Sequence, residues 1–189
     1  GEAVARLSGT TLDEAIYTLV DDKVVYRPMA NGIALEALIP TENDPTWRKR
    51  RVHGEVHDEN ACGVGGIAGH AGLFATARTV ADLGKNWLNQ TFAIEPDLYA
   101  ASVQLQAQTG NDVSGLGWVL RSSEGSSSGD FFSADSYGHT GFTGTTLWVD
   151  PQRQLVVALL TNRVYDGREK IGIHALRRAV HDAIVKAID

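Results

Sequence analysis

The chain has 189 residues, of which 43% are hydrophobic and 21% charged, a composition typical of a protein that folds around its own core. Its net charge of -6 argues against a nucleic-acid-binding surface, because such surfaces need clustered Lys and Arg. The single cysteine, Cys62, excludes an intrachain disulfide, and the lack of a long apolar run predicts no membrane-spanning segment.

Residues 2–9 and 10–20 predict two helices that meet at Gly9. Apolar residues recur at helical spacing in both stretches, and glycine commonly terminates helices. Thr10 or Thr11 would be the N-cap of the second helix. The chain opens with residues typical of a helix interior, so we expect the natural N-terminus, with any targeting signal, to lie outside this sequence.

Residues 21–51 show no clear periodicity, and two prolines with turn-forming residues between them predict a long surface excursion. The basic run 47–51 falls within it. Acidic residues flank this run, among them Glu42 and Glu55. We therefore expect a solvated loop whose charges are balanced locally.

His53 and His57 have a spacing that would place two imidazoles on one face of a helix, where they could hold a metal ion. However, Gly54 and Val56 disfavour a helix, and the order differs from the His-Glu-x-x-His of zinc peptidases. We favour a turn or strand that leads into the glycine-rich segment 62–76. A metal-dependent hydrolase is the alternative that these two histidines leave open.

The middle of the chain predicts two further helices and a short strand. Thr76 would cap a helix over 77–89, and a second helix candidate covers 95–108 with Pro96 in its first turn. A strand follows at 116–120. The Ser- and Gly-rich stretch 121–130 predicts a polar, mobile hairpin tip.

The C-terminal part predicts a β-hairpin and a closing helix. Apolar residues fill 147–149 and 155–160, with a turn at 150–153, and the long apolar second strand should be covered on both faces. The order of these elements predicts an α+β fold with an antiparallel sheet flanked by helices. The helix over 170–188 should pack across the hairpin through an apolar face made of Ile173, Leu176, Val180, Ile184 and Ile188.

The stretch 137–150 places Gly138 and Gly141 around His139 and Thr140, just before the apolar hairpin. Small residues let another backbone or a ligand approach a strand closely. A His-Thr-Gly sequence can present a ring nitrogen, a hydroxyl and a main-chain N–H to one pocket. From these residues alone, a pocket wall and a bulged edge strand are both open.

His139-Thr140-Gly141 resembles the Lys-Thr-Gly motif of the serine β-lactamase-like hydrolases, with His in place of Lys. This superfamily includes class C β-lactamases, DD-peptidases, D-aminopeptidases and related esterases. Other stretches resemble segments of the class C branch in the same order: the opening helices, a pocket wall, the strand before the motif and an LxNxxYP-like segment. These stretches are 1–16, 56–66, 115–118 and 159–166.

Two motifs of that superfamily are absent from the sequence. No serine is followed three positions later by Lys, and no Tyr is followed by x-Asn. In the family both motifs precede the helix with which this chain opens. The resemblance therefore implies an incomplete β-lactamase/transpeptidase-like fold, the C-terminal portion of a longer hydrolase that is inactive alone. Residues 1–90 would hold the rest of the helical subdomain and pocket-wall loops, and 91–189 the C-terminal part of the α/β subdomain.

The resemblance also implies a mechanism and a catalytic wall. A Ser activated by a Lys would form an acyl-enzyme that water releases, and both residues would lie outside this sequence. The Thr140 hydroxyl would bind a substrate carboxylate or carbonyl, and the Phe142 N–H, after Gly141, would form half of an oxyanion hole. His139 would stand where the family more often has Lys. Histidine is largely neutral near pH 7, which favours an esterase or peptidase-like activity over an efficient β-lactamase.

By the same resemblance, substrate binding falls to Asp58, Asn60 and Cys62 of the pocket-wall segment and to Asn162. No cofactor and no metal is implied. The expected substrate is a small ester, amide or peptide-like molecule. The expected partner is the missing N-terminal segment or another copy of the chain, because an incomplete core exposes apolar surface. A non-catalytic binding module that uses the same groove is the alternative function.

Overall fold

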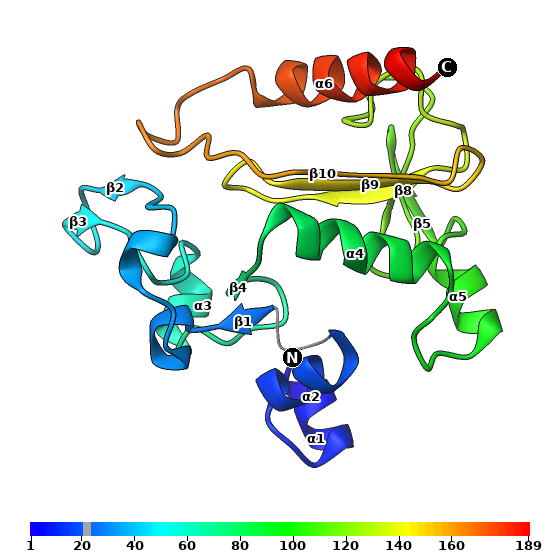
Figure 1. The fold of residues 1–189 in the computed structure, drawn as a ribbon. Helices are drawn as coiled ribbons and strands as arrows, with labels where there is room; N and C mark the ends of the chain where they lie inside the picture. The colour runs from blue at the N-terminus through cyan, green and yellow to red at the C-terminus, as the bar shows by residue number, and fades with distance from the viewer. Residues whose placement is uncertain (21–23) are drawn as a thin grey trace. The chain divides into compact units, whose positions relative to one another are not determined.

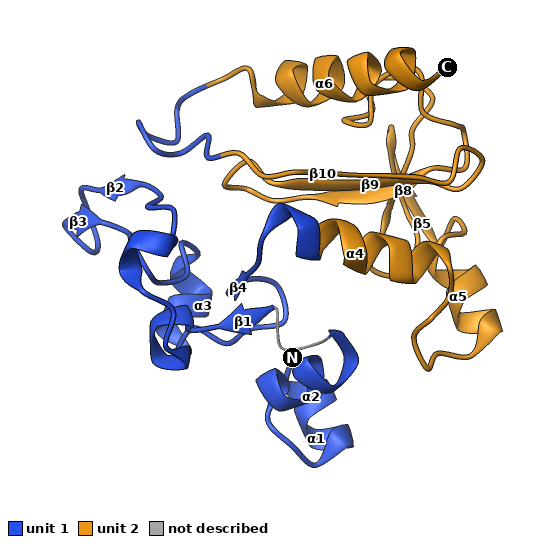
Figure 2. Ribbon diagram, in the orientation of Figure 1, with its two compact units in different colours: residues 1–79, 162–170 blue, residues 80–161, 171–189 orange. Residues whose placement is uncertain are grey.

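The structure is a computed structural model that describes residues 1–20 and 24–189; the first residues of the expected surface excursion, 21–23, lie outside this description. The chain forms two compact units (Figure 2). Unit 1 comprises residues 1–79 and 162–170, and unit 2 comprises 80–161 and 171–189. We describe each unit by itself. The domain boundary near residue 90 stays a prediction.

Unit 1 is made of short helices and two-residue strands connected by loops. Two small antiparallel pairs occur in it, β1 with β4 and β2 with β3. Its elements are α1 (Glu2–Ser8), α2 (Leu12–Val20), β1 (Val25–Tyr26), η1 (Pro28–Asn31), η2 (Leu35–Ala37), β2 (Asn43–Asp44), β3 (Arg50–Arg51), α3 (Glu59–Gly63), β4 (Leu73–Phe74) and the first turn of α4 (Ala77–Leu88).

The helix ends of unit 1 follow from local sequence. Gly9 ends α1 in the left-handed region at φ 70°, a conformation that glycine adopts without steric cost. The Thr11 N–H donates to the Glu14 carboxylate at the start of α2, over 3.0 Å. The Thr76 hydroxyl accepts the N–H of Thr79 at the start of α4. The predicted ends of these helices are confirmed.

The basic run differs from its prediction. Arg48 is buried, with only 5% of its side chain exposed, and its guanidinium donates to the carbonyls of Val56 and His57 over 2.9 and 3.1 Å. The Asp44 carboxylate, also buried, lies 3.7 Å from it. The predicted charge balance is confirmed, and Trp47, Lys49 and Arg50 are exposed as expected of a solvated loop, but Arg48 departs from that expectation because it bonds main-chain carbonyls inside the unit.

Unit 2 is a six-stranded antiparallel sheet with helices on both faces, which confirms the predicted α+β class (Figure 1). The strands follow in sequence order across the sheet, from β10 at one edge to β5 at the other. The elements are the rest of α4, α5 (Pro96–Ser102), β5 (Ala107–Thr109), β6 (Asp112–Ser114), β7 (Val119–Leu120), β8 (Tyr137–Thr140), β9 (Thr146–Asp150), β10 (Leu155–Leu159) and α6 (Ile173–Ile188).

The predicted hairpin of β9 and β10 is confirmed, and so is the cover of both of its faces. Trp148 and Val157 pack with Val185 of α6 on one face. On the other face, a Cβ at Gly84 of α4 would lie 2.7 Å from the Val156 side chain. Glycine at position 84 therefore lets α4 cross the sheet closely.

An aromatic chain fixes the α4 side of the sheet next to β8. The ring centroid of Trp87 on α4 lies 5.0 Å from that of Tyr99 and 5.4 Å from that of Trp118. The Trp118 ring in turn lies 5.2 Å from Tyr137, the first residue of β8. Tilted and edge-to-face pairs at these distances are favourable, so the start of β8 is held by a chain of aromatic rings in which Tyr99 and Tyr137 are buried and the two tryptophans half-buried.

The predicted packing of α6 across the hairpin is confirmed, but its buried face agrees only in part with the predicted apolar face. Its fully buried residues are Arg177, His181 and Val185, whereas Leu176 and Ile188 are 47% and 56% exposed. Val185 lies in the apolar core, and the predicted residue Ile184 packs against that core. The other two buried positions, Arg177 and His181, are polar because they bond loop carbonyls.

Two other segments also differ from their predictions. The Ser- and Gly-rich stretch is exposed at 123–125, but its second half is not, because Ser126 and Ser128 are buried and their neighbour Ser127 bonds Trp148 and His181. The predicted helix over 95–108 ends at Ser102, and β5 takes its last residues. None of the described helices has the length and apolar character needed to cross a membrane.

Candidate active-site strand and turn

β8 lies inside the sheet, between β7 and β9, so the edge-strand interpretation of this segment is wrong. Its two halves differ, however. β7 pairs with β8 only through Tyr137 and Gly138, whereas β9 pairs with all four residues. Among the described pairings, His139 and Thr140 are therefore bonded on the β9 side alone, and the opposite edge of their main chain extends beyond β7.

His139 and Thr140 point to opposite faces of the sheet, because side chains alternate along a strand. His139 is paired with Leu147, whose side chain packs near Gly84 of α4. Thr140 is paired with Thr146 and lies on the face that α6 covers. His139 is exposed and Thr140 half-buried, so both can be reached from the end of the strand.

The two glycines of the motif are required by the neighbouring strand. A Cβ at Gly138 would lie 2.6 Å from Cδ2 of Trp148 and would clash with the Leu147 carbonyl. A Cβ at Gly141 would clash with the Thr145 hydroxyl. Packing within the sheet thus accounts for both glycines without a ligand, and they carry no argument for a pocket on their own.

The imidazole of His139 has a defined tautomer. Its Nδ1 lies 2.9 Å from the carbonyl oxygen of Thr140. A carbonyl only accepts hydrogen bonds, so Nδ1 carries the proton and donates it. In the neutral ring Nε2 is then the acceptor, and it is the ring atom that could take a proton or bind a donor.

A five-residue turn, 141–145, connects β8 to β9 and holds the main chain of Phe142. The Gly141 N–H donates to the Thr145 carbonyl over 2.8 Å, and the Gly144 N–H donates to the Gly141 carbonyl over 3.1 Å. The Thr161 hydroxyl, beyond β10, donates to the Gly144 carbonyl over 2.8 Å. The Phe142 side chain is 55% exposed. The turn is therefore closed by its own backbone and supported from a second element.

Arg177 of α6 supports the same turn. Its Nη2 donates to the carbonyls of Gly141 and Thr145 over 2.8 and 2.9 Å. Sequence analysis did not find this residue, because it lies in a helical pattern in which apolar positions alone were assigned inward. The sequence did offer a signal, because Arg177 lies one turn after Ile173 of the apolar pattern, on the side of the helix that was expected to be buried.

The predicted substrate-binding residues Asp58, Asn60 and Cys62 lie together at α3 in unit 1. Asp58 caps the helix by accepting the Ala61 N–H over 2.8 Å, and it also accepts from His70 Nε2 over 3.0 Å. These bonds, the Ala61 N–H above all, hold the pKa of the Asp58 carboxyl below its usual value. Asp58 is thus an anion at neutral pH, and its capping bond fixes its orientation.

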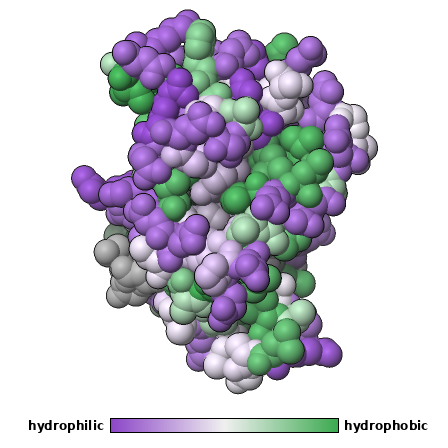
Figure 3. All heavy atoms as spheres, turned by 90° about the vertical axis from the view of Figure 1, so that its right-hand side faces the viewer, coloured by the Kyte–Doolittle hydropathy of each residue, from purple (hydrophilic) through white to green (hydrophobic). Residues whose placement is uncertain are grey.

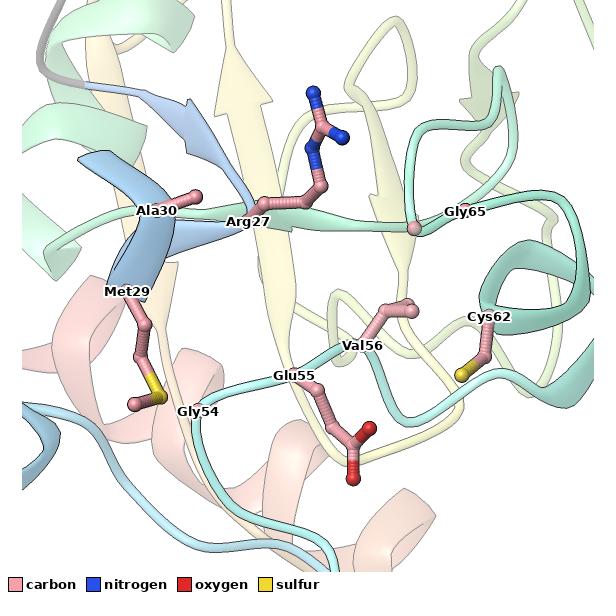
Figure 4. A pocket seen from close by; sticks show the side chains of 9 residues that line it. Arg27, Met29, Ala30, Gly54, Glu55, Val56, Cys62 and Gly65 are labelled. Atoms are coloured by element: carbon pink, nitrogen blue, oxygen red, sulfur yellow. The ribbon is translucent and has the colours of Figure 1, made fainter.

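Cys62 lines a cavity of about 300 Å³ in unit 1. Figure 4 shows its thiol pointing toward Val56, with Met29, Arg27 and Glu55 around the same space. Asn60 is exposed and is not among the lining residues. The cavity offers an apolar floor with one cationic and one anionic side chain at its rim.

Asn162 belongs to unit 1, where it contacts the chain near Pro40. Its Nδ2 donates to the Pro40 carbonyl over 2.6 Å, while its Oδ1 is buried without a partner in the described part of the chain. The four catalytic candidates, His139, Thr140, Gly141 and Phe142, are contiguous in unit 2. The structure thus groups the first three substrate-binding candidates and, separately, the catalytic candidates.

A buried charge network in unit 1 was missed by sequence analysis. The Glu42 carboxylate, 5% exposed, accepts from His57 Nε2 over 2.9 Å and from Arg168 Nε over 2.8 Å. Arg168 also pairs with Glu59, and this bond lowers the pKa of the Glu59 carboxyl. Arg168 is 126 residues from Glu42 in sequence, so no local pattern indicates the contact.

His53 and His57 do not converge on one point. His53 Nε2 donates to the Leu38 carbonyl over 2.8 Å, and His57 bonds Glu42. Within residues 1–20 and 24–189 there is no group of three or more His, Cys, Asp or Glu side chains that could hold a metal ion. The segment forms no helix between the two histidines, as the sequence indicated.

The chain is similar in sequence to bacterial proteins that are named as a carboxypeptidase and an amidase. A protein of Escherichia coli O157:H7 named "Putative D-alanyl-D-alanine carboxypeptidase" is 29% identical over 184 residues. A Bacillus subtilis (strain 168) protein named "N-acetylmuramyl-L-alanine amidase" is 32% identical over the same length. Each alignment covers 86% of this chain and 42% of the relative, so the chain spans less than half the length of these relatives.

A solved structure shares the fold. The crystal structure of a beta-lactamase from Mycobacterium bovis superposes with a TM-score of 0.61 at 20% identity, covering 98% of this chain and 60% of that one. The family model for beta-lactamase matches residues 1–181, which is nearly the whole chain. The resemblance that the ordered motifs indicated is thereby confirmed, and the chain belongs to the beta-lactamase family.

Proposed function

We propose that this chain supplies one wall of the active site of a serine hydrolase, which cleaves an ester or amide bond through an acyl-enzyme. The nucleophilic Ser and its Lys come from a segment outside this sequence, since the sequence contains no Ser-x-x-Lys. In this proposal Thr140 binds a carbonyl or carboxylate of the substrate. The Phe142 N–H donates to the developing oxyanion, a contact whose loss typically costs about 3 kcal/mol of transition-state stabilisation.

The proposal rests on the part of β8 that β7 does not pair with, His139 and Thr140, and on the hydrogen-bonded turn that follows it. His139 and Thr140 extend beyond the pairing of β8 with β7, and the turn 141–145 follows immediately. An extended peptide-like substrate can use such an edge through main-chain hydrogen bonds. Preorganised donors beside it are the feature that stabilises an acyl-transfer transition state.

The substrate class follows from the strand and from the names of the relatives. A carboxypeptidase and an amidase both cleave amide bonds, and the two relatives carry these names. With His139 in place of Lys, the site lacks a permanent positive charge where a substrate carboxylate would bind. We therefore place D-alanyl-D-alanine-type peptides and simple esters ahead of β-lactams as substrates.

Exposed apolar side chains in unit 2 support the proposal that another polypeptide segment binds this chain. Leu98, Leu105 and Leu116 of unit 2 are 55%, 56% and 51% exposed. Figure 3 shows hydrophobic patches between polar side chains on one face of the molecule. In the proposal such surface is covered by the segment that brings the Ser-x-x-Lys motif, or by a second copy of the chain.

The test is labelling of a protein that contains this chain together with a segment supplying Ser-x-x-Lys, using a fluorophosphonate or a fluorescent penicillin. We expect labelling that disappears when the added Ser is replaced by Ala, and that slows at least about 10-fold in Thr140→Val. The proposal fails if the intact protein neither labels nor hydrolyses a D-alanyl-D-alanine peptide or an ester.

The alternative, a binding module without turnover, is favoured by the absence of Ser-x-x-Lys from the sequence. It predicts that this chain alone binds the peptide, and that Thr140→Val weakens binding. It also predicts that no added segment produces hydrolysis. Calorimetric titration of this chain with the peptide, followed by the labelling experiment, separates the two functions.

A further inference from the structure

Arg177 lies at a buried position, where the desolvation of its guanidinium lowers the stability of the fold. It lies in the second turn of α6 on the buried stripe that continues with His181 and Val185, and it is 7% exposed. Removing a guanidinium from water is unfavourable unless its donors are used. An apolar residue at this place in the helix would carry no such cost. The contacts of the side chain therefore need an explanation beyond packing.

Two hydrogen bonds of Arg177 are made to the turn 141–145. One nitrogen, Nη2, donates to the carbonyls of Gly141 and Thr145, the first and last residues of the turn. The same two residues already bond each other through the Gly141 N–H and the Thr145 carbonyl. A single cationic group thus joins both ends of the turn from the α6 side.

The bond to Gly141 also fixes the direction of the next N–H. The Gly141 carbonyl and the Phe142 N–H belong to one planar peptide unit, and the described residues contain no cis peptide bond. In a trans peptide the carbonyl and the N–H point in opposite directions. With the carbonyl bound to Arg177, the Phe142 N–H is directed away from α6.

The positive charge of Arg177 also favours the Phe142 N–H as a hydrogen-bond donor. A cation at the carbonyl oxygen polarises the peptide unit, and hydrogen bonds in a chain strengthen one another in a low-dielectric interior. The Gly141 carbonyl accepts from both Arg177 and the Gly144 N–H. Its peptide partner, the Phe142 N–H, becomes a stronger donor as a result.

We propose that Arg177 is a positioning residue, which orients and polarises the Gly141–Phe142 peptide so that its N–H serves as the oxyanion donor. This inference rests on the proposed function for the role of the Phe142 N–H. The link between Arg177 and the turn does not depend on that function, and it can be measured on this chain alone.

The first experiment measures amide hydrogen exchange by NMR in three variants of this chain. In Arg177→Met, exchange at Gly141 and Gly144 should become at least about 10-fold faster, while β9 amides such as Trp148 change less than about two-fold. Arg177→Lys, which keeps the charge and can reach one carbonyl, should fall between. Arg178→Met is the matched control, because Arg178 bonds Ser126 and Asp130 instead of the turn.

The second experiment measures ester hydrolysis by the protein that supplies the nucleophile. Arg177→Met should lower kcat at least about 10-fold with KM changed less than two-fold, and Arg177→Lys should restore part of kcat. A change in KM alone, or an equal loss in Arg178→Met, overturns the inference. Should Arg177→Met fail to fold, Arg177→Lys and Arg177→Gln give the same comparison.

The two experiments also separate the inference from the proposed function. If the wild-type protein shows no hydrolysis, the proposed function fails, and the exchange data still decide whether Arg177 holds the turn. If hydrolysis is found but exchange at Gly141 and Gly144 is the same in Arg177→Met and wild type, the inference fails while the proposed function stands.

Discussion

His181 donates its Nδ1–H to the carbonyl oxygen of Ser127 over 2.8 Å, and this bond fixes the tautomer of a fully buried imidazole. In the part of the chain that the structure describes, the other ring nitrogen, Nε2, has no hydrogen-bond partner. Protonation of the ring would place a charged N–H where nothing accepts it. The residue therefore makes the stability of unit 2 depend on pH.

Burial holds the pKa of His181 below its usual value, and nearby Arg177 acts in the same direction, against the Ser127 bond and Asp182. A His whose folded-state pKa is depressed contributes stability above its unfolded pKa of about 6.5, and this stability is lost as the pH falls. Between pH 7.5 and 5.5 we expect a loss of at most about 1.4 kcal/mol in the free energy of unfolding. Urea titrations at both pH values measure it.

His181→Gln cannot titrate, so the loss between pH 7.5 and 5.5 should shrink even if the variant is less stable at both. His174→Gln is the control, because His174 lies on the same helix but is exposed. Equal pH dependence in wild type and His181→Gln would contradict the assignment.

Gly138→Ala tests the packing of β8 on β9. An added Cβ would lie 2.6 Å from Trp148, so either the indole or the strand must shift, at a cost of about 1–3 kcal/mol. Gly63→Ala is the control, since a Cβ there meets no atom within 4 Å and it ends a helix. Thermal unfolding of both variants gives the comparison. Equal melting temperatures would show that β8 can yield to the extra atom.

Thr146→Val tests a buried hydroxyl. Thr146 lies opposite Thr140, is 3% exposed, and its Oγ1 has no partner among the described residues. Replacement by Val should leave the free energy of unfolding unchanged or raise it by up to about 1 kcal/mol. The same change at Thr161, whose hydroxyl donates to Gly144, should lower it by about 1 kcal/mol. A clear loss in Thr146→Val would indicate a bound water or ligand at that hydroxyl.

His139→Lys tests the replacement of the charged residue of the motif. Lys carries a positive charge at neutral pH, so KM for a substrate with a free carboxylate should fall about two- to five-fold, the size of an exposed ion pair. KM for a neutral ester should stay the same. His174→Lys adds the same charge on α6 and should change neither value. The measurement needs the protein that supplies the nucleophile, and equal changes for both substrates would refute the role.

Local patterns predicted much of this fold. The apolar runs 147–149 and 155–160, with turn residues between them, predicted the hairpin because strand pairing there joins neighbours in sequence. The glycine at position 9 and the threonine at position 76 marked helix ends because caps are local too. The ordered motifs also indicated the family, and the His139–Thr140 strand was found at its expected place in the chain.

The errors have a common physical cause, which is that polar side chains were assumed to face water. Arg48, Arg177 and His181 are buried because they bond main-chain carbonyls that no helix or strand satisfies. Which carbonyls need partners depends on how loops fold, and hydrophobic spacing does not report it. The bond between Glu42 and Arg168 was missed for a related reason, since it joins distant parts of the sequence.

The sequential order of the strands has a consequence for how unit 2 assembles. Each strand from β5 to β10 pairs with its neighbour in sequence, so the sheet can form hairpin by hairpin through contacts that are mostly local, although residues 121–136 separate β7 from β8. α6 follows the sheet along the chain, so during synthesis it leaves the ribosome after the strands. The sheet can therefore form before the Gly141 carbonyl meets Arg177, and the turn 141–145 gains its bonds to Arg177 only when α6 docks.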